Sequence, residues 1–161
     1  MRLILAGLTL IVGFGLASGA RAEALRFQAD DWVAECDTSQ ATDAECSIIG
    51  VFSSENAIGP KGSFSLLIDL RNHLVAVVGK PFPGRALIRV DKNPPMECRG
   101  ERYCIFSNDD AETIVRQLKS GSLVLVDVFA GKSLFRSSLS TKGYRADLDK
   151  IYAQGFREFA N

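Results

Sequence analysis

Four cysteines are the most reactive side chains in this sequence, and their spacing decides which chemistry they suit. They form two local pairs, Cys36 with Cys46 and Cys98 with Cys104. A zinc site needs closely spaced Cys or His ligands, whereas the only histidine, His73, is distant from both pairs in sequence. A dithiol redox centre favours Cys-x-x-Cys, a spacing that neither pair has. We therefore expect disulfide bonds, and neither a metal nor another cofactor.

Four cysteines allow three disulfide pairings, and the intervening residues favour the two local ones. DTSQATDAE separates the first pair and RGERY the second, and both segments are polar and suited to turns. In the loop-entropy model each bridge contributes roughly 2 to 3 kcal/mol to stability. Disulfides of this kind are typical of small proteins in an oxidising compartment.

The first 22 residues have the layout of a secretory signal peptide. Arg2 gives a positive start, residues 3–16 form an apolar run, and residues 20–22 read Ala-Arg-Ala, a small-x-small cleavage site. An N-terminal anchor helix is the alternative, but the run is shorter than the ~20 residues that span a bilayer. We predict cleavage after Ala22 and a periplasmic, secreted or cell-surface protein.

Residues 23–161 have the length of a single domain. The whole chain carries 19 basic and 19 acidic residues, and loss of Arg2 and Arg21 with the signal leaves 17 and 19. Such a balance argues against a nucleic-acid partner or a polybasic membrane binder. No later run is long and apolar enough to be an integral membrane segment.

Candidates for catalysis are few. His73 falls in a polar turn, which makes a solvated residue a better interpretation than a general base. Asp69 and Asp127 interrupt apolar strands, but single polar residues are common on the solvent face of a strand. We expect no catalytic site.

The segment KPFPGRALIRVDK is the best candidate for a binding surface. In a strand, Arg85, Leu87 and Arg89 alternate to one face, near Lys80 and Lys92. Such a face suits an acidic partner or a phosphate group. A charged solvent face that protects a sheet edge explains the same pattern.

Most of the remaining chain has the two-residue alternation of half-buried strands, separated by turn residues. The strands are expected over residues 32–36, 46–52, 64–70, 74–78 and 86–90, with a further hairpin of 122–129 and 132–140 around Ala130 and Gly131.

Helical periodicity occurs twice, over residues 107–121 and 141–156. The first helix has Ser107 or Asn108 as its cap, and its apolar face holds Ala111, Ile114, Val115 and Leu118. The second has Thr141 as its cap, and its apolar stripe holds Tyr144, Leu148, Ile151 and Tyr152. The sequence therefore predicts a mainly β protein: one antiparallel β-sandwich-like domain with two peripheral α-helices and two local disulfides.

Several of these features, in this order, resemble the invasion-associated locus B family. They are Asp31-Trp32 before Cys36, then Cys46, the Pro-Gly-Arg stretch, Cys98 to Cys104, QLKSG before LVLVDV, and Leu139-Ser140 leading to Lys142-Gly143-Tyr144. The resemblance covers residues 27–152 and implies a small exported bacterial protein, linked in some members to host-cell invasion. It carries over no catalytic residue.

The sequence thus predicts a non-enzymatic exported protein, virulence-associated by resemblance, that binds a protein or another envelope or host component. An inhibitor of a secreted hydrolase, such as a lysozyme or protease, is the alternative. In that case the segment from Lys80 to Arg85 is expected to enter the enzyme's cleft.

Overall fold

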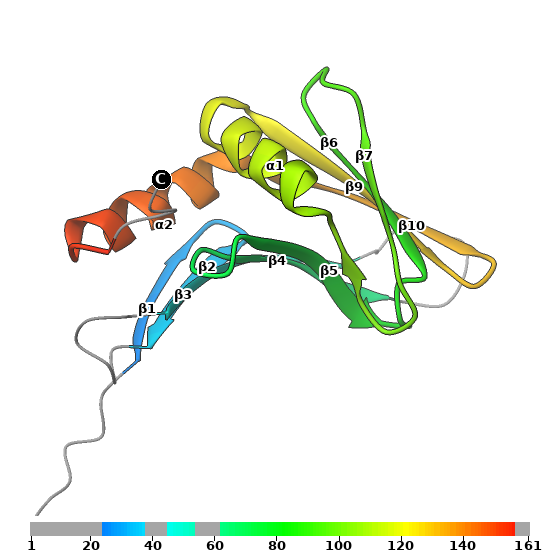
Figure 1. Ribbon diagram of the computed structural model, residues 1–161, viewed down its shortest axis with the longest axis horizontal. Coiled ribbons are helices and arrows are strands. Elements are labelled where there is room, and N and C mark those ends of the chain that lie inside the picture. Colours follow the sequence, from blue (N-terminus) through cyan, green and yellow to red (C-terminus); the bar gives the residue numbers. More distant parts are fainter. Residues whose placement is uncertain (1–23, 38–44, 54–61, 157–161) are drawn as a thin grey trace, which may run out of the picture.

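The computed structural model describes residues 24–37, 45–53 and 62–156, and these form a mainly β structure (Figure 1). The predicted signal peptide and the turn of residues 38–44 lie outside the described residues. Ten antiparallel strands join one sheet in the order β1-β2-β3-β4-β5-β8-β7-β6-β9-β10. The strands are β1 (Leu25–Ala29), β2 (Trp32–Asp37), β3 (Glu45–Ser53), β4 (Ser63–Asp69), β5 (Leu74–Lys80), β6 (Arg85–Val90), β7 (Met96–Arg99), β8 (Cys104–Ile105), β9 (Leu123–Ala130) and β10 (Ser133–Ser140).

The sheet curls over itself, so that its two ends form the two layers of a sandwich (Figure 1). Strands β1 to β5 make one layer, and β6, β7, β9 and β10 make the other, with β8 at the junction. The layers meet through Phe64 of β4 and Phe135 of β10, whose ring centroids lie 5.0 Å apart. The expected sandwich-like antiparallel fold is therefore confirmed, and it is built from one continuous sheet.

Helix α1 (Asn108–Ser120) matches its sequence signals closely. Ser107 is the N-cap and accepts a hydrogen bond from the backbone N–H of Asp110. Asp109 and Asp110 occupy the first turn, where they favour the positive end of the helix dipole. Its buried residues are the four expected ones, Ala111, Ile114, Val115 and Leu118.

Helix α2 (Thr141–Ala153) covers β1 to β3 and differs from expectation at two residues. Its N-cap is Ser140, which accepts from Lys142 N–H, while Thr141 is buried and donates to the carbonyl of Gly121. Tyr152 is 39% exposed and does not join the apolar stripe. A helix that meets a sheet on one side only buries a narrow stripe, and Tyr152 lies at its margin.

Trp32 and Gly143 determine how closely α2 approaches the sheet. The Trp32 indole is fully buried, packs edge-on against Tyr144, and donates from Nε1 to the carbonyl of Ser140 at 2.7 Å. A Cβ at Gly143 would lie 2.3 Å from the carbonyl oxygen of Ala29 and 2.7 Å from the Trp32 ring. Trp32 is therefore a core residue.

Both predicted disulfides are present. Cys36 and Cys46 are direct cross-strand partners in β2 and β3, with Cα atoms 4.1 Å apart. Cys98 and Cys104 join β7 to β8, with Cα atoms 5.4 Å apart. Neither described helix is long and apolar enough to cross a membrane.

Candidate functional site

The outer surface of β6, β7, β9 and β10 carries the predicted binding residues of β6. Arg85, Leu87 and Arg89 point outward because they alternate with the buried Ala86, Ile88 and Val90. Strand β9 alternates in the same way, which puts Leu125, Asp127 and Phe129 on the outside. We call this outer surface the arginine face, after the four arginines that it gathers: Arg85, Arg89, Arg99 and Arg136.

Strand register decides which of these side chains meet. Arg85 lies opposite Arg99 of β7 on one side and opposite Phe129 of β9 on the other. Asp127 lies between Leu87 of β6 and Arg136 of β10. Cross-strand neighbours of this kind have Cβ atoms roughly 5 Å apart, so their side chains interact directly.

Two carboxylates hold three of the four arginines. Glu97 bonds Arg85 at 2.7 Å and Arg99 at 2.5 Å, and the Arg85 guanidinium also lies 4.8 Å from the centroid of the Phe129 ring. The pKa of Glu97 is lowered, first by the hydrogen bond from Arg85 and then by the charges of Arg85 and Arg99.

The second carboxylate, Asp127, is held more tightly. Arg136 donates to both of its oxygens, at 2.6 and 2.7 Å, in the paired geometry that suits a guanidinium and a carboxylate. This bond raises the pKa of Arg136 above its usual value. Asp127 is only 19% exposed, so the pair is partly sheltered from solvent.

Arg89 differs from the other three. Its side chain is exposed, and among the described residues no ion pair or hydrogen bond engages its guanidinium. It lines a depression of about 260 Å³ in the arginine face, together with Leu87, Pro95, Leu125, Asp127 and Arg136. The depression therefore combines a cation that is available to a ligand with an apolar wall.

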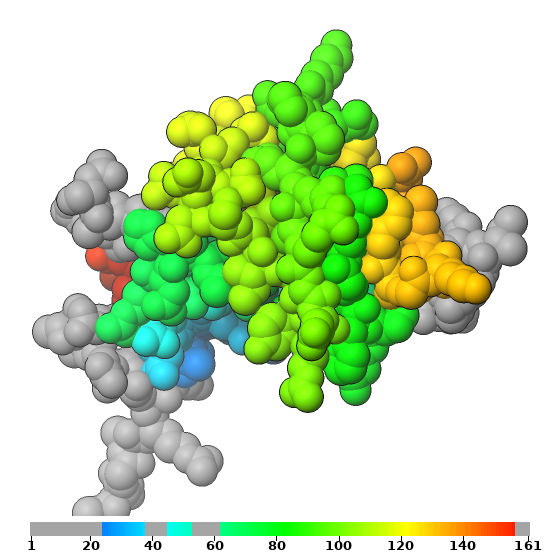
Figure 2. Space-filling view, turned by 45° about the vertical axis from the view of Figure 1, so that its right-hand side comes forward, coloured from blue at the N-terminus to red at the C-terminus, as the bar shows by residue number. Residues whose placement is uncertain are grey.

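The structure does not bring the four predicted basic residues together. Lys80 is the last residue of β5 and precedes β6, whereas Lys92 follows β6. The two lysines therefore lie beyond opposite ends of β6. Arg85 and Arg89 share the face but are separated by about 13 Å along the strand. Lys92 belongs to the turn after β6, whose hairpin with β7 projects from the body of the molecule (Figure 2). A single small anion cannot contact all four cations.

Sequence reasoning missed Glu97, Arg99 and Arg136. The expected hairpin around Ala130 and Gly131 pairs Asp127 with Leu134, whereas the observed two-residue turn consists of Gly131 and Lys132 and pairs Asp127 with Arg136. Strand β7 was not expected, since its four residues lie between a proline turn and a disulfide loop.

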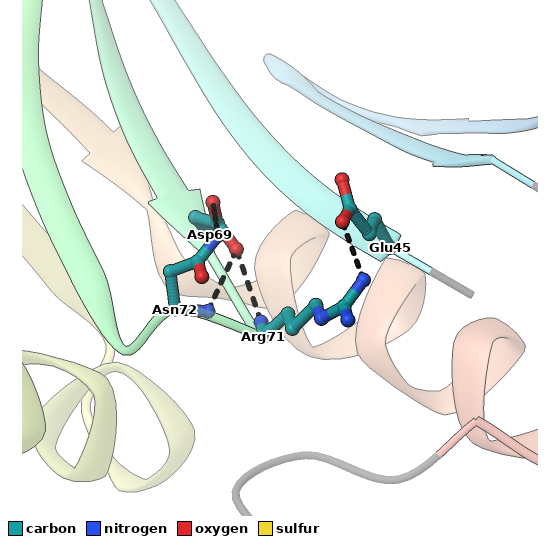
Figure 3. Close-up of polar contacts among 4 residues, drawn as sticks. All are labelled: Glu45, Asp69, Arg71 and Asn72. Carbon is teal, nitrogen blue, oxygen red and sulfur yellow. Dashed lines mark hydrogen bonds and ion pairs between the residues drawn. The ribbon is translucent and has the colours of Figure 1, made fainter. Parts of the chain in front are cut away.

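The two carboxylates considered for catalysis do not form a pair. Asp69 is on β4 and Asp127 on β9, with four strands between them in the sheet. Asp69 accepts hydrogen bonds from the backbone N–H groups of Arg71 and Asn72 and from the Asn72 side chain (Figure 3). It therefore organises the β4–β5 turn, to which the ion pair of Arg71 with Glu45 ties the start of β3.

Two further titratable residues, His73 and Asp147, belong to the framework of the fold. His73 lies in the β4–β5 turn with φ +51°, as the turn interpretation predicts. Asp147 of α2 is fully buried, which raises its pKa despite the ion pair with Lys150. Because Lys150 also donates to the carbonyl of Gln28, this ion pair fastens α2 to β1.

Comparisons of the chain with protein-family models, with curated proteins and with solved structures find no match.

Proposed function

We propose that this protein is a non-enzymatic, exported bacterial envelope protein of the invasion-associated locus B type, which binds an anionic partner through its arginine face. The partner is a protein or another component of the envelope or of a host. The protein is periplasmic, secreted or at the cell surface, after loss of the first 22 residues.

One observation carries the binding proposal, namely the exposed guanidinium of Arg89 in a depression of the arginine face. The face holds four arginines against two carboxylates, whereas the whole chain has equal numbers of acidic and basic residues. A local positive surface on a neutral chain attracts acidic partners and leaves the rest of the molecule without that attraction.

The disulfides support export. Two bridges join all four cysteines, which is the arrangement expected of a protein that folds in an oxidising compartment. Each bridge joins strands of one sheet, so the reducing cytosol would remove two covalent supports of the fold.

The binding test uses hexaglutamate blocked at both ends, titrated into the protein in a calorimeter. We expect Arg89→Gln/Arg99→Gln to weaken binding roughly five- to tenfold, since each exposed charge contributes up to about 1 kcal/mol. Arg26→Gln/Arg116→Gln removes the same charge from β1 and α1 and should leave the affinity unchanged. Equal affinity of the two double variants would refute the proposal.

The non-enzymatic part is tested separately, on a panel of cell-envelope substrates. Turnover by the purified protein that disappears in Asp69→Asn or Asp127→Asn would overturn it. These carboxylates are engaged with the β4–β5 turn and with Arg136, and we expect no turnover.

A second candidate function, inhibition of a secreted hydrolase, is favoured by the segment from Lys80 to Arg85. Phe82 is 54% exposed in this segment. Two residues further along the chain, Gly84 donates to the carbonyl of Phe129 at 3.0 Å and accepts from Gly100 N–H at 3.2 Å. An apolar side chain on a loop fixed in this way suits an enzyme cleft. Loss of lysozyme or protease inhibition in Phe82→Ala would support this function.

A further inference from the structure

The depression beside Arg89 is lined by residues of two different chemistries. Leu87, Pro95 and Leu125 supply apolar surface, and Arg89, Asp127 and Arg136 supply charge. Leu125 is the direct cross-strand partner of Arg89, so an apolar side chain and an available guanidinium lie next to each other. A ligand that fills the depression therefore needs an apolar group and an anion close together.

The charges of the depression select a ligand with a single negative charge. Asp127 and Arg136 neutralise one another through their paired hydrogen bonds, which leaves the charge of Arg89. A phosphate monoester carries about −1.5 to −2 at neutral pH, so it would exceed this charge and be repelled by Asp127. A carboxylate matches it and suits the planar guanidinium.

The size of the depression further limits the kind of ligand that it can bind. Its volume of about 260 Å³ is below the roughly 300 to 1,000 Å³ of sites that enclose a whole small molecule. It is suited to one residue at the end of a larger partner. The last residue of a polypeptide carries a carboxylate and a side chain on the same Cα, whereas the carboxylate of Asp or Glu terminates its own side chain.

We propose that this depression captures the C-terminal carboxylate of a partner polypeptide together with its last apolar side chain. Arg89 binds the carboxylate, and Leu87, Pro95 and Leu125 contact the side chain. Asp127 and Arg136 complete the lining of the depression. This inference rests on the proposed function, because it specifies the anionic group that the arginine face recognises.

The test compares two minimal probes, N-acetyl-leucine and its neutral amide N-acetyl-leucinamide, by NMR titration of isotope-labelled protein. We expect N-acetyl-leucine to shift the amide signals of Arg89 and Leu125 saturably, and the amide to bind about fivefold more weakly. The Arg89→Gln variant should bind the two probes with equal affinity. Arg26→Gln removes an exposed arginine from edge strand β1 and should retain the difference between the probes.

Two further titrations separate failure of this inference from failure of the proposed function. If blocked hexaglutamate binds the arginine face while the two leucine probes bind equally or not at all, the C-terminal site is refuted and the proposed function stands. If neither hexaglutamate nor N-acetyl-leucine binds, both fail. Inorganic phosphate that binds Arg89 more tightly than N-acetyl-leucine would refute the charge argument.

Discussion

The two layers of the sheet present outer faces of opposite character. On β2 to β5, one row of cross-strand partners is apolar throughout: Val33, Ile49, Leu67 and Ala76, continued by Ile105 of β8. On β6, β7, β9 and β10, the corresponding surface is the arginine face. The inner residues of both layers are alike, since nearly all are buried and apolar.

This difference shows which residues of a strand are determined by the requirements of folding. The two-residue alternation requires apolar residues on the inner side of each strand and leaves the outer side undetermined. The core therefore does not require an arginine at position 89, and a partner is a sufficient reason for one. The two outer faces should also respond to opposite conditions, because salt weakens contacts made by exposed charges but not contacts between apolar side chains.

The largest expected effect on the structure of the arginine face comes from breaking the junction of the two layers. Strand β8 shares only two residue pairs with β5 and one with β7, so the Cys98–Cys104 bridge strengthens a weak seam. Cys98→Ala/Cys104→Ala should lower the free energy of unfolding by about 2 kcal/mol, measured in urea. It should also shift the amide signals of β6 and β7.

The matched control removes the other bridge. Cys36→Ala/Cys46→Ala opens a longer loop and should cost about 3 kcal/mol, but six residue pairs still join β2 to β3. The arginine face should therefore keep its amide signals. Identical spectra of β6 and β7 in the two double variants would contradict the role given to the seam.

A smaller effect, on ligand affinity, is expected from Asp127→Asn, which removes the counter-charge of Arg136. Two positive charges then face the depression, so N-acetyl-leucine should bind up to about fivefold more tightly. Phosphate should gain more than the carboxylate, because it carries more charge. The experiment is the same NMR titration, and weaker binding of N-acetyl-leucine would show that Asp127 contributes by orienting Arg136.

Glu97→Gln tests the other carboxylate of the arginine face. The pKa of Glu97 is lowered from its ordinary value of 4.5 in the folded protein. Its ion pairs therefore stabilise the fold at pH values above 4.5, and this contribution is lost as the pH falls through the lowered pKa. The stability difference between wild type and variant should therefore shrink from pH 7 to pH 3. A difference that stays constant with pH would contradict this assignment.

The smallest effect on affinity and stability is expected from a substitution in the apolar row of β2 to β5. Leu67→Lys changes the outer face of β4 and should leave hexaglutamate affinity unchanged, with a stability change within about 1 kcal/mol. Calorimetry and urea unfolding measure the two quantities. A several-fold change in hexaglutamate affinity would mean that the two outer faces are not independent.

Local signals predicted the long elements and the core well. Helix α1 has the capping residue and the four buried residues that its sequence indicates, because propensity, capping and periodicity agree there. Helix α2 was less predictable at its ends, since Ser140 and Thr141 are both good caps and only the approach to the sheet decides between them. Strand β8 has two residues, too few for any alternation to be recognised.

The candidate site was predictable only in part. Arg85 and Arg89 follow from alternation within one strand, but Arg99 and Arg136 join them through strand pairing, which single-strand patterns do not contain. Lys80 and Lys92 were grouped with them because they are close in sequence. The turns at the two ends of β6 separate them.

The most direct test of the account is a map of the amide signals that move when blocked hexaglutamate is added to the labelled protein at low salt. The account predicts shifts on β6, β7, β9 and β10, centred on Arg89 and reversed by added salt. Shifts confined to β2–β5 or to α2, or shifts unaffected by salt, would contradict it.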